Sequence, residues 1–304
     1  MRRDDVSRPK ECSSRPLTLD RGRSDTSAPG FLEIATAGRE TAVFDYPRAM
    51  RVGLFVTCLV DQFRPGTAEA TVTVLEGAGC EVVVDPAQTC CGQPAFNAGL
   101  RSDAIPVCRR TIDRLAAQLD DGCEVIVSPS GSCVSMFRHA VEMLSRAGDE
   151  AGAETAARVA GASMELASFL VRRLDRTDLG ASWPGRVTWH DACHGLRELG
   201  IRDEPRRLLA AVEGLEIIEA RTCERCCGFG GTFSVDLPGI STGMADDKID
   251  ELETLGVDAV VSGDASCLMQ LEGRLEARGS RIRTVHLAEI LAARERVPDA
   301  RSTR

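Results

Sequence analysis

The chain lacks the features that would suggest a membrane, a nucleic acid or a nucleotide as its partner. It has no run of about 18 apolar residues and no apolar secretory core at its N-terminus, which excludes a membrane span and predicts a cytoplasmic protein. The net charge of −9, with acidic and basic residues interspersed, leaves no electrostatic footprint for nucleic acid. No Walker motif or dinucleotide fingerprint is present, and GFGG at residues 228–231 follows a cysteine pair rather than a strand.

Cysteine, by contrast, is abundant, with 13 in 304 residues. In a chain without an export signal this abundance favours metal ligation or redox chemistry over a disulfide framework. Two adjacent pairs, each followed by glycine, lie at residues 90–92 and 226–228. Neighbouring cysteines rarely bridge each other, because the ring they would close is small and strained. Each pair is therefore expected to find its partners elsewhere in the chain.

The cysteines belong to a tandem repeat. Three segments of the first half have counterparts in the second: RVGLFVTCLVD (51–61) matches RVTWHDACHGL (186–196), VSPSGSC (127–133) matches VSGDASC (261–267), and ELASFL (165–170) matches HLAEIL (286–291). Four cysteines recur at an almost constant offset of 134 to 136 residues. The last match has a smaller offset, so the first half must carry an insertion, predicted as a longer helix over residues 136–160.

Strand-like and helix-like segments alternate within each repeat, which predicts an α/β fold of two tandem similar domains with parallel sheets. The expected strands lie near residues 51–57, 81–84 and 124–128, then 186–190, 215–219 and 258–262; the expected helices lie near 67–78, 100–120, 203–213 and 240–256. Four cysteines follow strand ends directly. Cysteine sites are therefore expected at the carboxyl ends of the strands, where open α/β sheets bind their ligands.

Composition divides the chain into four parts. Residues 1–49 are rich in Arg, Ser, Asp and Pro and lack apolar periodicity, so we expect a disordered extension, with translation naturally starting at Met50. Two cysteine-rich domains are expected at residues 50–178 and 179–295, divided where Gly, Ser and Pro cluster. Residues 296–304 are expected to form a disordered tail.

Two strand ends and one Cys-Cys loop should bring four thiols together in each half. The candidate cofactor and metal ligands are Cys58, Cys90, Cys91, Cys133, Cys193, Cys226, Cys227 and Cys267, with Cys223 as a candidate extra ligand. Four thiolates bind Zn²⁺ tetrahedrally or hold an iron–sulfur cluster. Adjacent cysteines favour the cluster, because neighbouring thiolates can bind different irons. His194 beside Cys193 is the candidate catalytic residue, oriented by Asp191, because histidine changes charge near neutral pH.

The doubled arrangement of one cysteine, a Cys-Cys-Gly triplet and a further cysteine resembles the CCG cysteine-rich domain found in heterodisulfide reductase and in the glycolate oxidase iron–sulfur subunit. LFVTCLVDQF, CCGQPAFNAG and CCGFGGTFSV are most similar to the lactate utilisation protein A family, over about residues 50–293. The resemblance implies an iron–sulfur redox component of a complex that oxidises L-lactate to pyruvate. It also implies ferredoxin-like iron–sulfur and other partner subunits, so the chain would be a subunit of an oxidoreductase of the L-lactate dehydrogenase type that does not depend on NAD.

The chain departs from the heterodisulfide reductase pattern at two positions. Ser130 and Asp264 stand where that pattern has the first cysteine of a Cys-x-x-Cys, which favours a four-thiolate [4Fe–4S] cluster over a five-thiolate one. The closely spaced ferredoxin signature is absent, so a cluster relay would continue in another protein. Two alternatives stay open: a zinc-stabilised non-catalytic scaffold subunit, and a heterodisulfide or thiol redox protein that uses the Cys-Cys pairs.

Overall fold

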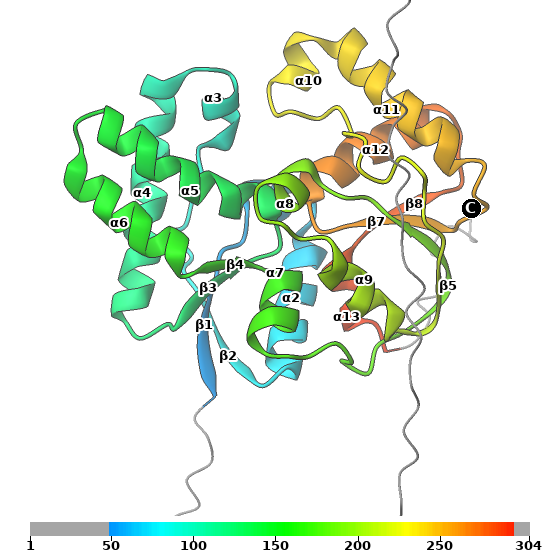
Figure 1. Cartoon of the computed structure of the whole chain (residues 1–304), viewed down its shortest axis with the longest axis horizontal. Helices are drawn as coiled ribbons and strands as arrows, with labels where there is room; N and C mark the ends of the chain where they lie inside the picture. The colour runs from blue at the N-terminus through cyan, green and yellow to red at the C-terminus, as the bar shows by residue number, and fades with distance from the viewer. Residues whose placement is uncertain (1–48, 295–304) are drawn as a thin grey trace, which may run out of the picture. The chain divides into compact units, whose positions relative to one another are not determined.

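The structure of the chain, a computed structural model, describes residues 49–294 and contains two parallel four-stranded sheets (Figure 1). The strand orders are β2-β1-β3-β4 and β6-β5-β7-β8, so the second sheet repeats the first. This confirms the predicted fold of two tandem α/β repeats with parallel sheets. The predicted N-terminal extension and C-terminal tail fall outside the described residues.

The strands pair in matching registers in the two sheets. They are β1 (Met50–Leu54), β2 (Cys80–Val84), β3 (Val125–Ser128), β4 (Ser163–Glu165), β5 (Ser182–Trp189), β6 (Glu213–Ile217), β7 (Ala259–Ser262) and β8 (Arg283–His286). Val52 of β1 pairs with Val82 and Val125, as Val187 of β5 pairs with Ile217 and Ala259. Every residue of β3 and β7 is buried, which is typical of parallel strands covered by helices on both faces.

Helices connect the strands, as the crossovers between parallel strands require. In the first half they are α1 (Cys58–Phe63), α2 (Pro65–Gly77), α3 (Gln93–Asn97), α4 (Arg101–Asp120), α5 (Gly131–Arg146), α6 (Glu150–Gly161), α7 (Leu166–Ser168) and the π-helical turn η1 (Phe169–Arg173). In the second half they are α8 (Cys193–Arg197), α9 (Asp203–Ala210), α10 (Phe233–Asp236), α11 (Pro238–Leu252), α12 (Ala265–Ala277) and α13 (Leu287–Ala292). Among residues 49–294, no helix combines the length and the apolar character that crossing a bilayer needs.

The insertion in the first half differs from its prediction. Instead of one long helix over residues 136–160, the chain forms α5 and α6 with a break between them. Gly148 ends the first helix with a φ of +81°, and the Asp149 carboxylate begins the second by accepting a hydrogen bond of 2.8 Å from the Gly152 N–H. A glycine in the left-handed region followed by an aspartate N-cap is a strong helix-breaking pair.

The two halves share one hydrophobic core. Val52 and Val127 of the first sheet belong to the same buried cluster as Val187 and Val261 of the second. Between the halves, α13 packs against α2, and α8 packs against α5 (Figure 1). Apolar side chains of the two halves are therefore buried together, and the domain boundary at residue 178 stays a prediction.

Equivalent residues of the two repeats meet where the halves join. Ser130 and Asp264, which occupy the same position in the repeat, form an antiparallel bridge. The Asp264 carboxylate accepts hydrogen bonds from the Ser130 hydroxyl at 3.2 Å and the Ser132 N–H at 3.1 Å. A residue that contacts its own repeat counterpart lies near an approximate two-fold axis, as in a symmetric dimer. The carboxyl ends of the two sheets therefore face each other.

Glu165 and His286 are also repeat counterparts beside this junction. The His286 ring bonds the Pro129 carbonyl oxygen at 3.0 Å, whereas Glu165 lies against Gly263, the counterpart of Pro129. Glu165 is only 4% exposed, and its carboxylate accepts a hydrogen bond of 3.1 Å from the Ser168 N–H. Burial raises the pKa of the Glu165 carboxyl from 4.5 to about 7.

Glu165→Gln is expected to remove a pH-dependent loss of stability. The folded chain keeps a proton on Glu165 that the unfolded chain releases, so between pH 4.5 and about 7 the free energy of unfolding falls as pH rises. The total fall is about 3 to 4 kcal/mol, at about 1.4 kcal/mol for each pH unit. In urea unfolding of both proteins, the stability of Glu165→Gln relative to the wild type should therefore rise as pH rises from 4.5 to about 7, and the difference should stay constant above pH 7.

The matched control is Glu142→Gln, at a side chain that is 65% exposed. It should follow the wild type at every pH, because removing an exposed charge changes the free energy of unfolding little. Parallel stability curves for Glu165→Gln and the wild type would contradict the prediction.

Candidate functional site

The four predicted cysteines of the first half come together at the carboxyl edge of the first sheet. Cys58 begins α1 directly after β1, Cys90 and Cys91 lie in the loop after β2, and Cys133 lies in the first turn of α5. The Sγ atoms of Cys58 and Cys90 are 3.6 Å apart, and Cys91 hydrogen-bonds both Cys90 and Cys133. The Gly92 N–H donates to the Cys90 Sγ at 3.4 Å. We call this group the first sulfur site.

The second half repeats the arrangement, which we call the second sulfur site. Cys193 begins α8, Cys226 and Cys227 lie in the loop after β6, and Cys267 lies in the first turn of α12. Side-chain hydrogen bonds join Cys193 to Cys226 and Cys227 to Cys267. The Gly228 N–H donates to the Cys226 Sγ at 3.4 Å, as Gly92 does in the first site. The order of contacts is the same in both halves.

One thiol in each site is set to lose its proton first. Hydrogen bonds from Cys58 and then from Cys91 lower the pKa of Cys90 well below its usual value, and the same interaction raises the pKa of Cys58. In the second site, hydrogen bonding from Cys193 is the largest cause that lowers the pKa of Cys226. The thiolate is the form of cysteine that binds metal, so each site presents a ligand ready to bind.

Both sulfur sites open into a single cavity at the junction of the two halves. Its volume is about 280 Å³, and all eight predicted cysteines line it. The polar side chains in its wall include Thr57, Gln93, Ser130, His194 and Asp264. The approximate two-fold relation explains this arrangement, because it turns the two carboxyl edges toward each other.

His194 lies in the wall of this cavity, as expected for a residue near the chemistry. Its Nδ1 is 3.5 Å from the Cys193 Sγ, and its Nε2 is 3.4 Å from the Gln93 side-chain amide. The Glu198 carboxylate is 3.9 Å from Nε2 and also bonds the His139 ring at 2.9 Å. The Glu198 carboxylate therefore links His194 in the cavity wall to His139, which is partly exposed.

Asp191 does not orient His194, contrary to the sequence-based expectation. Within the described chain, its carboxylate accepts hydrogen bonds from the Trp189 ring N–H at 2.8 Å and from the Arg206 guanidinium at 2.9 and 3.0 Å. The carboxylate beside His194 is Glu198, four residues later. That i, i+4 spacing was visible in the sequence, because residues four apart face each other on a helix.

Cys223, the candidate extra ligand, does not line the cavity. It is fully buried, and its backbone carbonyl accepts hydrogen bonds from the Lys248 ammonium at 3.2 Å and from the Asp191 N–H at 3.2 Å. Its role as a ligand stays a prediction. The other buried cysteines that do not line the cavity are Cys80, Cys108 and Cys123.

His190 was not among the candidate ligands predicted from the sequence. One of its ring nitrogens lies within 4.8 Å of the Sγ atoms of both Cys227 and Cys267, a group that could hold a metal ion. The repeat offers a signal for this residue, because the matching position of the first half is Phe55, which cannot bind a metal.

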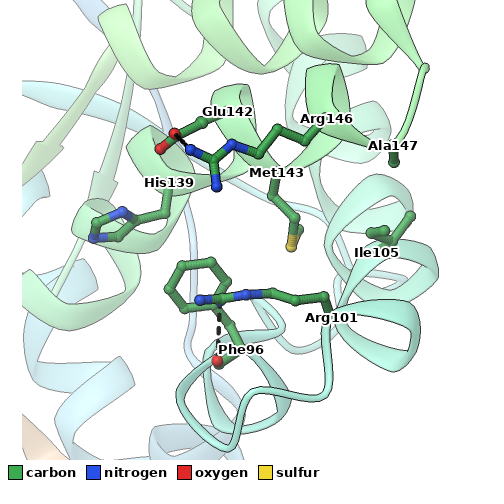
Figure 2. Close-up of a pocket in the computed structure, with 8 residues that line it drawn as sticks. All are labelled: Phe96, Arg101, Ile105, His139, Glu142, Met143, Arg146 and Ala147. Atoms are coloured by element: carbon green, nitrogen blue, oxygen red, sulfur yellow. Dashed lines mark hydrogen bonds and ion pairs between the residues drawn. The ribbon is translucent and has the colours of Figure 1, made fainter.

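A second cavity, of about 220 Å³, lies between α3, α4 and α5, and Figure 2 shows its lining. The Arg101 guanidinium lies 3.6 Å from the centre of the Phe96 ring, and Arg146 pairs with Glu142 at 2.5 Å. None of the predicted site residues lines this cavity. Its charged groups already have partners, so it adds no chemistry to the sulfur sites.

Known proteins match the chain over both repeats. The family model described as CCG, cysteine-rich domain, matches residues 52–138 and 187–272. Lactate utilization protein A of Geobacillus thermodenitrificans is 43% identical over 242 residues, which cover 80% of this chain and 98% of that protein. Lactate utilization protein A of Bacillus subtilis is 41% identical over 245 residues, which cover 81% of this chain and 100% of that protein.

Among solved structures, a hypothetical protein from Helicobacter pylori superimposes with a TM-score of 0.55 at 12% identity. The match covers 80% of this chain and 48% of that one, so the chain spans about half the length of that structure. At this identity the likeness shows the fold alone.

Proposed function

The chain belongs to the CCG cysteine-rich family that includes lactate utilization protein A, and from that membership we propose that it acts in lactate utilisation as an iron–sulfur redox subunit. The observation that carries the proposal is the convergence of all eight repeat cysteines on one cavity. Oxidation of L-lactate to pyruvate releases two electrons and two protons. The proposed role is to pass those electrons to a partner subunit.

The residues of each sulfur site fit an iron–sulfur cluster. Four thiols from three separate segments surround each position, which suits the four cysteine ligands of a [4Fe–4S] cluster. Such a cluster would supply reversible transfer of single electrons. The Gly92 and Gly228 N–H groups point at the Sγ atoms of Cys90 and Cys226, where hydrogen bonds make a bound cluster easier to reduce.

The wider setting belongs to the same proposal. We place the chain in the cytoplasm, as a subunit of an L-lactate-oxidising complex that does not depend on NAD. Its partners would be a ferredoxin-like iron–sulfur subunit and further subunits, because this chain has no ferredoxin signature of its own. His194 is the candidate for moving a proton at the cavity wall, since it contacts both Cys193 and Gln93.

Anaerobic purification followed by metal analysis tests the proposal. We expect about eight irons and eight sulfides for each chain, four in each half, with visible absorption from thiolate-bound iron. Cys91→Ser should remove the first centre and Cys227→Ser the second, so each variant should lose about half of the iron. Cys123→Ser, a buried thiol away from the cavity, should keep the wild-type iron content.

Other outcomes would favour the two alternatives. A colourless protein with one zinc in each half would contradict electron transfer and support the scaffold. Metal-free chains whose Cys90 or Cys226 is rapidly alkylated would support thiol redox chemistry instead. A strain without the gene should fail to grow on L-lactate, and the Cys227→Ser gene should not restore growth.

A further inference from the structure

The two sulfur sites differ at one structurally equivalent residue. The Phe55 N–H donates to the Val127 carbonyl at 2.9 Å, and the His190 N–H donates to the Val261 carbonyl at 2.8 Å, so the two residues hold the same backbone position. Phe55 is fully buried and packs edge-on against Phe137, with ring centres 5.2 Å apart. His190 is buried to the same degree, at 1% exposed. An apolar ring in one half is an imidazole in the other.

The His190 imidazole is not satisfied by the protein around it. Neither ring nitrogen has a hydrogen-bond partner among the described residues. The Cys223 backbone carbonyl lies near the ring but already accepts hydrogen bonds from the Asp191 N–H and the Lys248 ammonium, and it does not reach normal hydrogen-bond geometry with the imidazole. A buried polar group without a partner costs about 1–3 kcal/mol, so an orphaned imidazole calls for an explanation.

The thiols of the second sulfur site supply that explanation. A His190 ring nitrogen and the Sγ atoms of Cys227 and Cys267 lie within 4.8 Å of one another, and the negative charge of Cys226 also acts on the ring. The Ser262 hydroxyl donates to the His190 carbonyl at 3.1 Å and so fixes the backbone that carries the ring. The imidazole is therefore held beside two candidate ligands of the same centre.

A buried lysine lies near the thiols of the second sulfur site. Lys248 is the only lysine among residues 49–294, and it is 1% exposed. Its ammonium donates to the carbonyl oxygens of Thr222 at 3.1 Å and Cys223 at 3.2 Å. Its positive charge acts on the Cys227 and Cys267 thiols, the two candidate ligands beside His190.

We propose that His190 is a nitrogen ligand of the centre in the second sulfur site, so that the two halves hold chemically different centres. The first site offers four thiolates, whereas in the second site the imidazole takes the place of one of the four thiolates, next to Cys227 and Cys267. This inference rests on the proposed iron–sulfur function. A neutral imidazole stabilises the oxidised centre less than a thiolate does, and the Lys248 charge acts in the same direction. The second centre is therefore the easier one to reduce, and electrons run from the first half toward the second.

Pulsed electron paramagnetic resonance on the full chain tests the ligand directly. The iron-loaded protein, grown with ¹⁵N-labelled histidine and then reduced, should show the strong nitrogen coupling of a coordinated imidazole on one of its two centres. His190→Cys should keep the iron, because it supplies a thiolate at the same position, but should lose the nitrogen coupling. His194→Gln should keep the coupling, which separates His190 from the histidine next to Cys193.

The outcomes distinguish this inference from the proposed function. Iron-loaded chains without strong nitrogen coupling, or with coupling lost in His194→Gln instead, would overturn the inference alone. Chains that bind no iron would overturn the proposed function and the inference together. Because a substitution at a buried position can impair folding, the spectrum of the first centre in each variant reports whether the chain is intact. A redox titration should also show two potentials in the wild type, with the higher one lowered in His190→Cys.

Discussion

Asp191→Ala is expected to destabilise the folded chain by about 3–5 kcal/mol, the usual effect of breaking a buried ion pair. The Asp191 side chain is 1% exposed and meets the Arg206 guanidinium through two hydrogen bonds of 2.9 and 3.0 Å. It also accepts the Trp189 ring N–H, which would be buried without an acceptor in the variant. Glu219 would remain on Arg206 as its other carboxylate partner, at 2.6 Å.

The loss should also reach the second sulfur site. Asp191 lies two residues before Cys193, and its N–H donates to the Cys223 carbonyl, so it joins the two loops that flank the site. We expect the variant to lose iron from the second half and keep it in the first. Urea unfolding and iron analysis on the same preparations measure both effects.

Glu142→Ala provides the matched control for this charge. Glu142 pairs with Arg146 four residues later, but its side chain is 65% exposed. An exposed pair contributes about 0.2–0.5 kcal/mol, so the control should unfold almost as the wild type does. Equal losses of stability in Asp191→Ala and Glu142→Ala would contradict the prediction that Asp191 stabilises the fold through a buried ion pair. Asp191→Asn keeps an oxygen that can accept the Trp189 N–H, so its loss of stability should lie between the losses of Asp191→Ala and Glu142→Ala.

Gly228→Ala is expected to disrupt the second sulfur site and to destabilise the chain by at least about 2 kcal/mol. Gly228 has a φ of +86°, which disfavours any side chain, and an added Cβ would lie 2.5 Å from the Ser241 carbonyl oxygen. Moving away from that oxygen would shift the N–H that donates to the Cys226 Sγ. Iron in the second half should fall, while iron in the first half stays.

Substitutions at two other glycines, Gly92 and Gly239, provide comparisons for Gly228→Ala. Gly92→Ala meets the same strain in φ, at +87°, but the nearest atom to an added Cβ is the Ala104 carbonyl oxygen at 3.2 Å, so its effect should be smaller and confined to the first centre. Gly239→Ala lies in α11 with nothing within 4 Å of an added Cβ, and it should leave both centres intact. Loss of iron in Gly239→Ala to the extent seen in Gly228→Ala would contradict the steric argument.

The convergence of thiols within each half could be predicted from sequence, because its causes are local and repeated. Cys58 and Cys133 follow predicted strands of one sheet, and parallel strands end at a common edge. The break at Gly148 and Asp149 was also encoded locally, although the Ala-rich stretch around it suggested one continuous helix. Strands β4 and β8 were not predicted, because their residues, SME and RTVH, lack the continuous apolar run that identifies β3 and β7.

The merging of two sites into one cavity could not be predicted in this way. It depends on the pairing of Ser130 with Asp264 and on the packing of α13 against α2, contacts between residues more than 100 positions apart. No periodicity reports such contacts. The Asp191 partner was hidden for a similar reason, since Arg206 approaches from α9 across a loop, whereas the histidine near Asp191 in sequence suggested a nearer partner.

The bridge between Ser130 and Asp264 has a consequence for how such a chain can change during evolution. In a dimer of identical chains, a residue on the two-fold axis meets its own copy, so each substitution there occurs on both sides at once. Joining two copies into one polypeptide removes that restriction and lets each half vary alone. A serine can then face an aspartate, and a phenylalanine in one lobe can correspond to a histidine in the other. Gene duplication followed by fusion thus allows a symmetric fold to hold chemically different residues in its two halves, so that electrons can move in one direction between them.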